Sequence, residues 1–188
     1  MENDEELIAA YLKGEENAFP LLVQRHLKPV YSFVVRFVGN KDDAEDIVQE
    51  TFLKAWKNLK KYSRQNARFK TWIMRIARNA SIDYLRKKKQ IPFGALEGED
   101  GEEWFAENVQ DESQLPDEIA AHKGDLQEME QALNKLTPVH RETLLLYYSG
   151  GFTFEEAAIV SGISINTLKS RHRRAIVELR KLLVHPKS

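Results

Sequence analysis

The chain has 188 residues, with 28 Lys or Arg, 29 Asp or Glu, and no cysteine. The lack of cysteine excludes disulfides, cysteine-ligated zinc or iron–sulfur sites and a thiol nucleophile. No apolar run approaches the roughly 18 residues that a membrane-spanning helix needs, and the acidic N-terminus lacks the apolar segment of a secretory signal. We therefore expect a soluble intracellular protein without membrane insertion, of one ordinary domain or two small ones.

Charge is segregated along the chain, although the formal net charge is only −1. Residues 60–89 hold eleven Lys or Arg and one acid, whereas residues 91–118 hold ten Asp or Glu and no Lys or Arg. Residues 164–188 are basic again, with seven Lys or Arg and one acid. The acidic stretch contains glycines and prolines and no helical period, so we interpret 91–118 as a flexible linker between domains 1–90 and 119–188. The two basic blocks predict two surfaces for a polyanion.

The N-terminal block has the apolar spacing of helices. Apolar residues recur at helical intervals from Leu7 to Leu12 and again from Ala18 to Val38. Pro29 lies inside the second segment and predicts a kink or a break there. We expect this helix to end at Gly39-Asn40.

A third helix is expected to run to about Leu59. Asp42 or Asp43 is positioned to be its N-cap. After a polar turn, two separate helical stretches are predicted, at 69–77 and at 81–89.

The C-terminal block also has helical patterning. An apolar stripe from Leu126 to Leu136 precedes a helix start at Thr137-Pro138, with proline at the first helical position. Gly150-Gly151 is expected to end that helix. No strand-like alternation of any length occurs, so the predicted fold class is all-α, with two small helical domains.

The most specific local pattern is a helix-turn-helix over 154–171. Ala158 is small enough for two helices to cross closely, and Gly162 provides the positive φ that the tight turn needs. Ser164 or Asn166 is expected to cap the second helix. That helix is rich in Lys and Arg, which predicts that its N-terminal end enters the major groove of DNA.

Two clusters allow more than one interpretation. The cations of 60–89 alternate with aromatic residues, and such a pattern is typical of a surface that stacks unpaired bases. Phe69 and Trp72 equally fit the core stripe of a helix, and the spacing favours the core for each. The carboxylates between Asp42 and Glu50 would need partners from another element to hold a metal, so a helix cap or a docking surface is the favoured interpretation. No cofactor, metal site or catalytic arrangement is predicted.

Three segments together resemble one family. They are 44–56 (AEDIVQETFLKAW), 69–86 (from FKTWIMRIARN to DYLR) and the helix-turn-helix that ends with NTLKSR at 166–171. Their order and the acidic linker between them resemble bacterial extracytoplasmic-function (ECF, group IV) sigma factors of RNA polymerase, within the sigma-70 family.

The resemblance implies a division of labour. The first domain, 1–90, would bind the β′ clamp of core RNA polymerase and open the −10 element, and the second, 119–188, would read the −35 element and contact the β flap. The linker would thread channels of the polymerase. Implied partners are core polymerase, promoter DNA and an anti-sigma factor. The implied location is the bacterial cytoplasm, including retention at the membrane by the anti-sigma factor, and no enzymatic activity is implied.

The resemblance also assigns residues to each surface. Core polymerase would be bound by Asp46, Gln49, Glu50 and Phe52. The −10 DNA would be contacted by Arg75, Arg78, Asn79, Ala80 and Ser81, with a flipped base held by Asn79 and Ser81. The −35 DNA would be contacted by Asn166, Thr167, Lys169, Ser170, Arg171, Arg173 and Arg174.

Two other functions are compatible with parts of the pattern. A dimeric helix-turn-helix regulator would bind a palindrome without core polymerase. A nucleic-acid enzyme would use the acids of 42–50 with a divalent metal. The carboxylate helix and the mixed cationic and aromatic block argue against the regulator.

Overall fold

The computed structural model describes residues 3–89 and 126–184. Within these ranges every regular element is helical, which confirms the predicted all-α class. We call residues 3–89 the N-terminal bundle and residues 126–184 the C-terminal bundle. The predicted linker, 91–118, lies outside the described residues.

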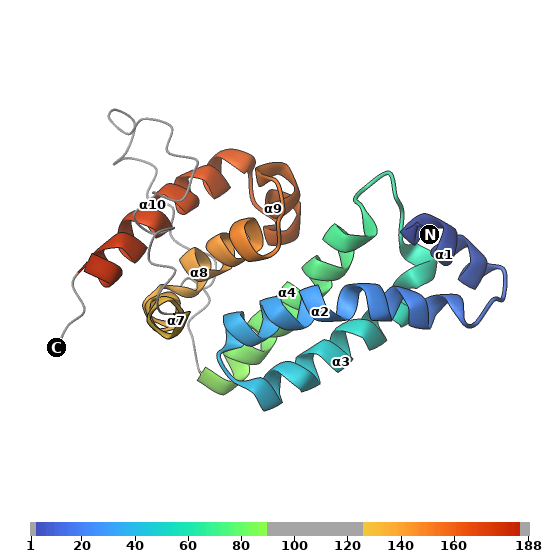
Figure 1. Cartoon of the computed structure of the whole chain (residues 1–188). Coiled ribbons are helices and arrows are strands. Elements are labelled where there is room, and N and C mark those ends of the chain that lie inside the picture. The colour runs from blue at the N-terminus through green and yellow to red at the C-terminus, as the bar shows by residue number, and fades with distance from the viewer. Residues whose placement is uncertain (1–2, 90–125, 185–188) are drawn as a thin grey trace.

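The N-terminal bundle is built on three long helices. Its elements are α1 (Asp4–Leu12), α2 (Ala18–Val38), α3 (Lys41–Asn58), the 3₁₀ turn η1 (Leu59–Lys61) and α4 (Phe69–Lys89). Helices α2, α3 and α4 pack against one another, and α1 packs on α2 at the end remote from the C-terminal bundle (Figure 1). Phe33, Phe37 and Ile73 are fully buried among them, so the apolar stripes seen in the sequence form one core.

Neither of the two predicted interruptions breaks a helix. Helix α2 is continuous through Pro29. Buried Val30, Phe33 and Val34 follow the exposed proline, and their packing outweighs one lost backbone hydrogen bond. Helix α4 is also a single helix rather than two stretches. Within it the Ser81 hydroxyl donates to the carbonyl of Ala77, so the polar group of this buried serine is satisfied inside the helix it was expected to begin.

The N-cap of α3 was also predicted wrongly. The capping residue is Asn40, whose side-chain oxygen accepts a hydrogen bond from the Asp43 backbone N–H at 3.0 Å. Asp42 and Asp43 therefore lie within the first turn, where their negative charges interact favourably with the positive end of the helix dipole.

In the C-terminal bundle, the start of the second helix, α8, is as predicted. Its elements are α7 (Leu126–Lys135), α8 (Pro138–Leu144), the π-helical turn η2 (Leu145–Ser149), α9 (Phe154–Ser161) and α10 (Ile165–Val184). Thr137 caps α8, and Pro138 takes the first helical position. The helix then widens into η2, where the Gly150 N–H donates to the carbonyl of Leu145 at 2.8 Å.

The two bundles are in contact through buried side chains. Leu146, Phe152 and Val160 of the C-terminal bundle belong to the same buried apolar cluster as Phe33 and Ile73. Helix α9 packs on α4, and η2 packs on α2 (Figure 1). A second, smaller apolar cluster lies within the C-terminal bundle and joins α7, α8 and α10. The structure therefore fixes how one bundle faces the other.

Candidate nucleic-acid interface

The helix-turn-helix has the turn chemistry predicted from its sequence. Thr153 and Glu156 form a capping box at the start of α9. Gly162 ends α9 with φ +71°, a backbone conformation that side chains other than glycine rarely adopt. The Ser164 hydroxyl accepts from the Thr167 N–H at 3.0 Å, so Ser164 rather than Asn166 caps α10.

Helix α10 presents one polar face to solvent. The side chains of Asn166, Lys169 and Arg173 are exposed. Thr167, Ser170 and Arg174 are partly exposed, and the Arg174 Nη2 donates to the Ser170 hydroxyl at 2.9 Å. Six of the seven residues expected at the −35 element therefore have exposed or partly exposed side chains. Arg171 is only 4% exposed and faces the interior of the bundle, so it does not share this face.

His172 is enclosed in a ring of aromatic side chains that sequence patterns did not indicate. Its imidazole lies 5.2 Å from the ring of Tyr147 and 5.2 Å from that of Phe154, and its Nε2 is 3.0 Å from the Tyr148 hydroxyl. Burial, assisted by the charge of Arg173, lowers the pKa of His172 from 6.5 to about 4. A neutral imidazole thus forms part of the core that supports α10.

Helix α3 carries the expected acidic face. Asp46, Gln49 and Glu50 are exposed, and Glu50 pairs with Lys54 at 2.6 Å. Phe52 is 8% exposed and packs in the core instead, so it is not presented with the other three. Over residues 3–89 and 126–184 no three acidic or histidine side chains are grouped as metal ligands would be.

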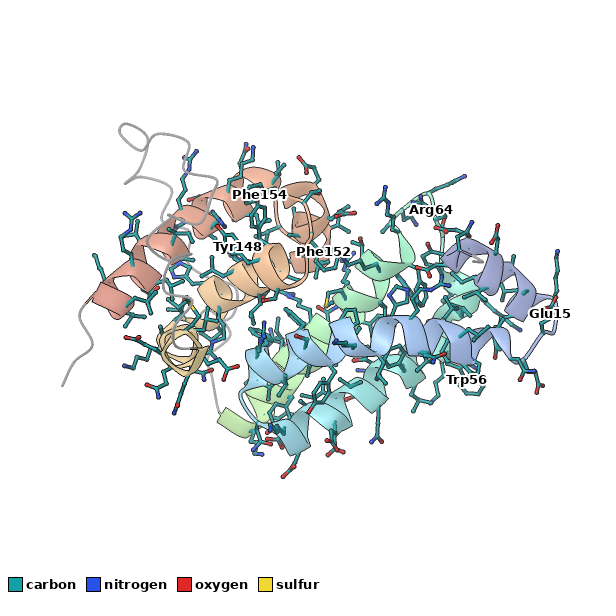
Figure 2. The ribbon with its side chains drawn as sticks, in the orientation of Figure 1. Glu15, Trp56, Arg64, Tyr148, Phe152 and Phe154 are labelled. Carbon is teal, nitrogen blue, oxygen red and sulfur yellow. The ribbon has the colours of Figure 1, made fainter. Side chains whose placement is uncertain are left out.

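Trp56 is an exposed aromatic residue near the C-terminal end of α3. It is 48% exposed (Figure 2). Its indole N–H donates to the hydroxyl of Tyr11, and Leu53, one turn earlier, is also exposed. The polar face of α3 therefore continues into an apolar patch.

Helix α4 separates the residues expected at the −10 element. Arg75 and Asn79 are exposed, whereas Ala80 and Ser81 are buried in the bundle core. The Ser81 hydroxyl is already satisfied by Ala77, so in this arrangement it does not reach a base. The side chain of Arg78 is mostly buried and turned toward the C-terminal bundle.

The aromatic residues around the start of α4 form one contact group. The ring of Phe69 is fully buried and lies 5.5 Å from Trp72 and 5.6 Å from Tyr62. The preference for a core role is confirmed for Phe69. Trp72 is partly exposed at the edge of the same cluster.

Arg78 connects the two bundles through a buried ion pair. Its Nε and Nη2 lie 3.1 and 3.3 Å from the two carboxylate oxygens of Glu142 in α8. Glu142 also accepts a hydrogen bond from the Ser161 hydroxyl. The side chains of Arg78 and Glu142 are only 14% and 3% exposed, so this pair is shielded from solvent.

The comparisons with known proteins match the two bundles separately. The family model for Sigma-70 region 2 matches residues 22–91, and that for Sigma-70 region 4 matches residues 126–179. Among the described residues, no helix is long and apolar enough to span a membrane.

Curated relatives and solved structures match most of the chain, including both bundles. The ECF RNA polymerase sigma factor SigW of Bacillus subtilis is 31% identical over 173 residues, 91% of each chain. The RNA polymerase sigma factor NccH of Alcaligenes xylosoxydans is 32% identical over 183 residues, 96% of this chain and 94% of that one. The sigma factor RpoE of Bartonella quintana, solved with the anti-sigma factor NepR, superposes with a TM-score of 0.65 at 30% identity, covering 88% of this chain and 96% of that one. CnrH, solved with the cytosolic domain of CnrY, gives a TM-score of 0.68 at 26% identity, covering 98% and 99%. The chain therefore belongs to the ECF sigma factors of RNA polymerase.

Proposed function

We propose that this sigma factor directs core RNA polymerase to promoters by reading −35 duplex DNA with α10 and capturing the −10 non-template strand with α4. The observation that carries the proposal is the exposed polar face of Asn166, Lys169 and Arg173 at the start of α10, directly after the Gly162 turn. Helix N-terminal residues that follow such a turn are the ones that reach base edges in the major groove.

The −35 contacts divide by exposure. Lys169 and Arg173 provide the charges that bind phosphates or purine edges, and Asn166 provides an amide for base recognition. Arg174 is held by Ser170, which limits its side-chain freedom before DNA arrives. Arg171 contributes from inside the bundle by supporting α10, since its side chain is buried.

The −10 contacts rest on Arg75, Arg78 and Asn79. A flipped base needs hydrogen-bond partners and cationic support to offset the cost of unstacking. Asn79 supplies donors and an acceptor, and the two arginines supply charge. Ala80 and Ser81 position this segment through the core rather than by touching DNA.

Core polymerase is bound through the exposed face of α3 in this proposal. Asp46, Gln49 and Glu50 form its polar part, and Phe52 holds the helix in the bundle from the opposite side. The domain functions follow: 1–90 for polymerase and the −10 element, 91–118 for the connection, and 119–188 for the −35 element and the β flap.

An anti-sigma factor is the proposed regulator. One solved relative is in complex with the anti-sigma factor NepR, and another is in complex with the cytosolic domain of CnrY. We infer a partner of this kind for the present chain, and a place in the bacterial cytoplasm from which such a partner withholds it from polymerase.

The test is run-off transcription with purified core polymerase and a genomic fragment pool from the source bacterium. New transcripts that start downstream of shared −35 and −10 sequences are expected only when the protein is added. Core polymerase alone is the control. Failure of the folded protein to bind core polymerase, together with binding of a palindrome as a dimer, would replace the proposal with the dimeric regulator.

A further inference from the structure

We propose that the C-terminal bundle acts as a built-in competitor of the −10 strand, with the Glu142 carboxylate occupying Arg78 until the bundles separate. This inference rests on the proposed function, because it takes α4 as the surface that binds the −10 strand. It goes further in assigning a residue of one bundle to the control of the other.

The ion pair between Arg78 and Glu142 has the geometry of phosphate recognition. Two guanidinium nitrogens face the two carboxylate oxygens at 3.1 and 3.3 Å, the paired arrangement that arginine also uses for a phosphate. The Ser161 hydroxyl donates to Oε1 of Glu142, the same oxygen that accepts from Nε of Arg78, and so helps to fix the carboxylate. Arg78 cannot make the same two bonds to Glu142 and to DNA at once.

Lys70, two turns before Arg78 on α4, also binds groups of the C-terminal bundle. Its ammonium donates to the Gly150 carbonyl at 2.7 Å and lies 4.4 Å from the centre of the Phe152 ring. Phe152 lies on the side of the C-terminal bundle that faces the N-terminal bundle (Figure 2). A carbonyl oxygen and an aromatic face are the same kinds of partner that a nucleic-acid strand offers to a cation.

Two further cations mark the rim of the contact. Arg36 of α2 donates to the Ser149 hydroxyl at 3.0 Å, and Arg68 lies 3.8 Å from a carboxylate oxygen of Glu156. Both arginines are exposed, so these contacts are screened by solvent and contribute less than the Arg78 pair. All four side chains nevertheless bring positive charge of the N-terminal bundle onto acceptor groups of the C-terminal bundle.

The charge of Glu142 stabilises the closed arrangement, in which the two bundles are in contact. The apolar contacts between the bundles do not depend on the charge at position 142, but a neutral residue there would leave the Arg78 guanidinium buried without a counter-ion and so weaken the closed form. Removing one partner of a buried pair is strongly unfavourable for that reason. Separation of the bundles would restore water to Arg78, so loss of the Glu142 charge shifts the chain toward an open form that is able to bind DNA.

The experiment uses the full chain carrying Glu142→Gln, which keeps the size of the side chain and an acceptor for Ser161. The chain has no cysteine, so Lys57→Cys and Lys181→Cys at two exposed positions allow a donor and an acceptor dye to report the distance between bundles. Binding of a fluorescein-labelled single strand of mixed sequence is measured by anisotropy without polymerase. Glu130→Gln, an equal change of charge at an exposed position of α7, is the matched control.

We expect Glu142→Gln to lower energy transfer and to tighten apparent binding of the strand about tenfold or more, because apparent affinity scales with the open fraction. Glu130→Gln is expected to leave energy transfer unchanged and affinity within about twofold. Unchanged transfer in Glu142→Gln overturns the proposal whatever the affinity does. A fall in transfer without tighter binding overturns it as well, because the exposed surface would then not be the one that binds DNA.

A second variant covers the case in which Glu142→Gln does not fold, as judged by circular dichroism. Phe152→Leu removes the ring beside Lys70 but retains an apolar side chain. It should lower energy transfer and tighten strand binding by about threefold, as Glu142→Gln does more strongly. Equal readouts for Phe152→Leu and wild type would then count against the competitor role. Neither readout uses polymerase, so failure of the proposed function would appear separately, as absence of core binding by the wild-type chain.

Discussion

Acidification is expected to destabilise the helix-turn-helix through His172. The pKa of this imidazole is about 4 in the folded chain and 6.5 as its ordinary value. At pH 5 the unfolded imidazole is protonated and the folded one is neutral, so the unfolded state binds more protons and gains stability as the pH falls. Proton linkage gives a loss of about 2 kcal/mol in the free energy of unfolding between pH 7.5 and pH 5.

The measurement is urea unfolding of the wild type and of His172→Phe at both pH values. Phenylalanine keeps a ring against Tyr147 and Phe154 but has no proton to bind. The loss of stability on acidification should therefore be about 2 kcal/mol smaller in the variant. Burial also lowers the pKa of His26, but that residue is common to both proteins and cancels in the comparison. Equal losses in the two proteins would refute the assignment of a buried neutral imidazole at position 172.

Two further predictions concern the surfaces for DNA and polymerase. Lys169→Ala and Arg173→Ala should each weaken binding of the holoenzyme to promoter DNA, by about 1–3 kcal/mol where the side chain reads a base, and a filter-binding or anisotropy titration with unchanged affinity in both would remove them from the −35 contact. Glu50→Ala should reduce affinity for core polymerase without changing the thermal midpoint, whereas Phe52→Ala should lower the free energy of unfolding by about 3 kcal/mol because it opens a cavity in the bundle. Core-binding titrations and calorimetry of the two variants test this contrast, and equal effects of both changes on binding and stability would contradict it.

Local signals predicted the helix-turn-helix and the start of α8 well. Gly162 has the positive φ that the turn pattern indicated, Thr137 and Pro138 begin α8, and Ser164 was one of two expected caps of α10. Each of these features depends on residues within four positions of one another, so backbone geometry and capping chemistry are sufficient to find them.

The face that each residue presents was harder to predict. Successive residues on a helix are rotated by about 100°, so a continuous motif necessarily includes residues that point inward. Ser81 and Arg171 were assigned to DNA from such motifs and are buried. The contact between Arg78 and Glu142 lies across 64 positions of sequence, and no local pattern indicates which acid of one bundle meets which arginine of the other.

The carbonyl that receives Lys70 belongs to a residue with no room for a side chain. A methyl group on Gly150 would lie 2.6 Å from the Phe152 ring and 2.7 Å from the Leu146 carbonyl oxygen. The backbone at Gly150 is right-handed, so glycine is needed here for space and not for conformation. Any larger residue would displace the ring against which Lys70 rests. Position 150 therefore controls the fit between the bundles through side-chain size, whereas position 142 controls it through charge.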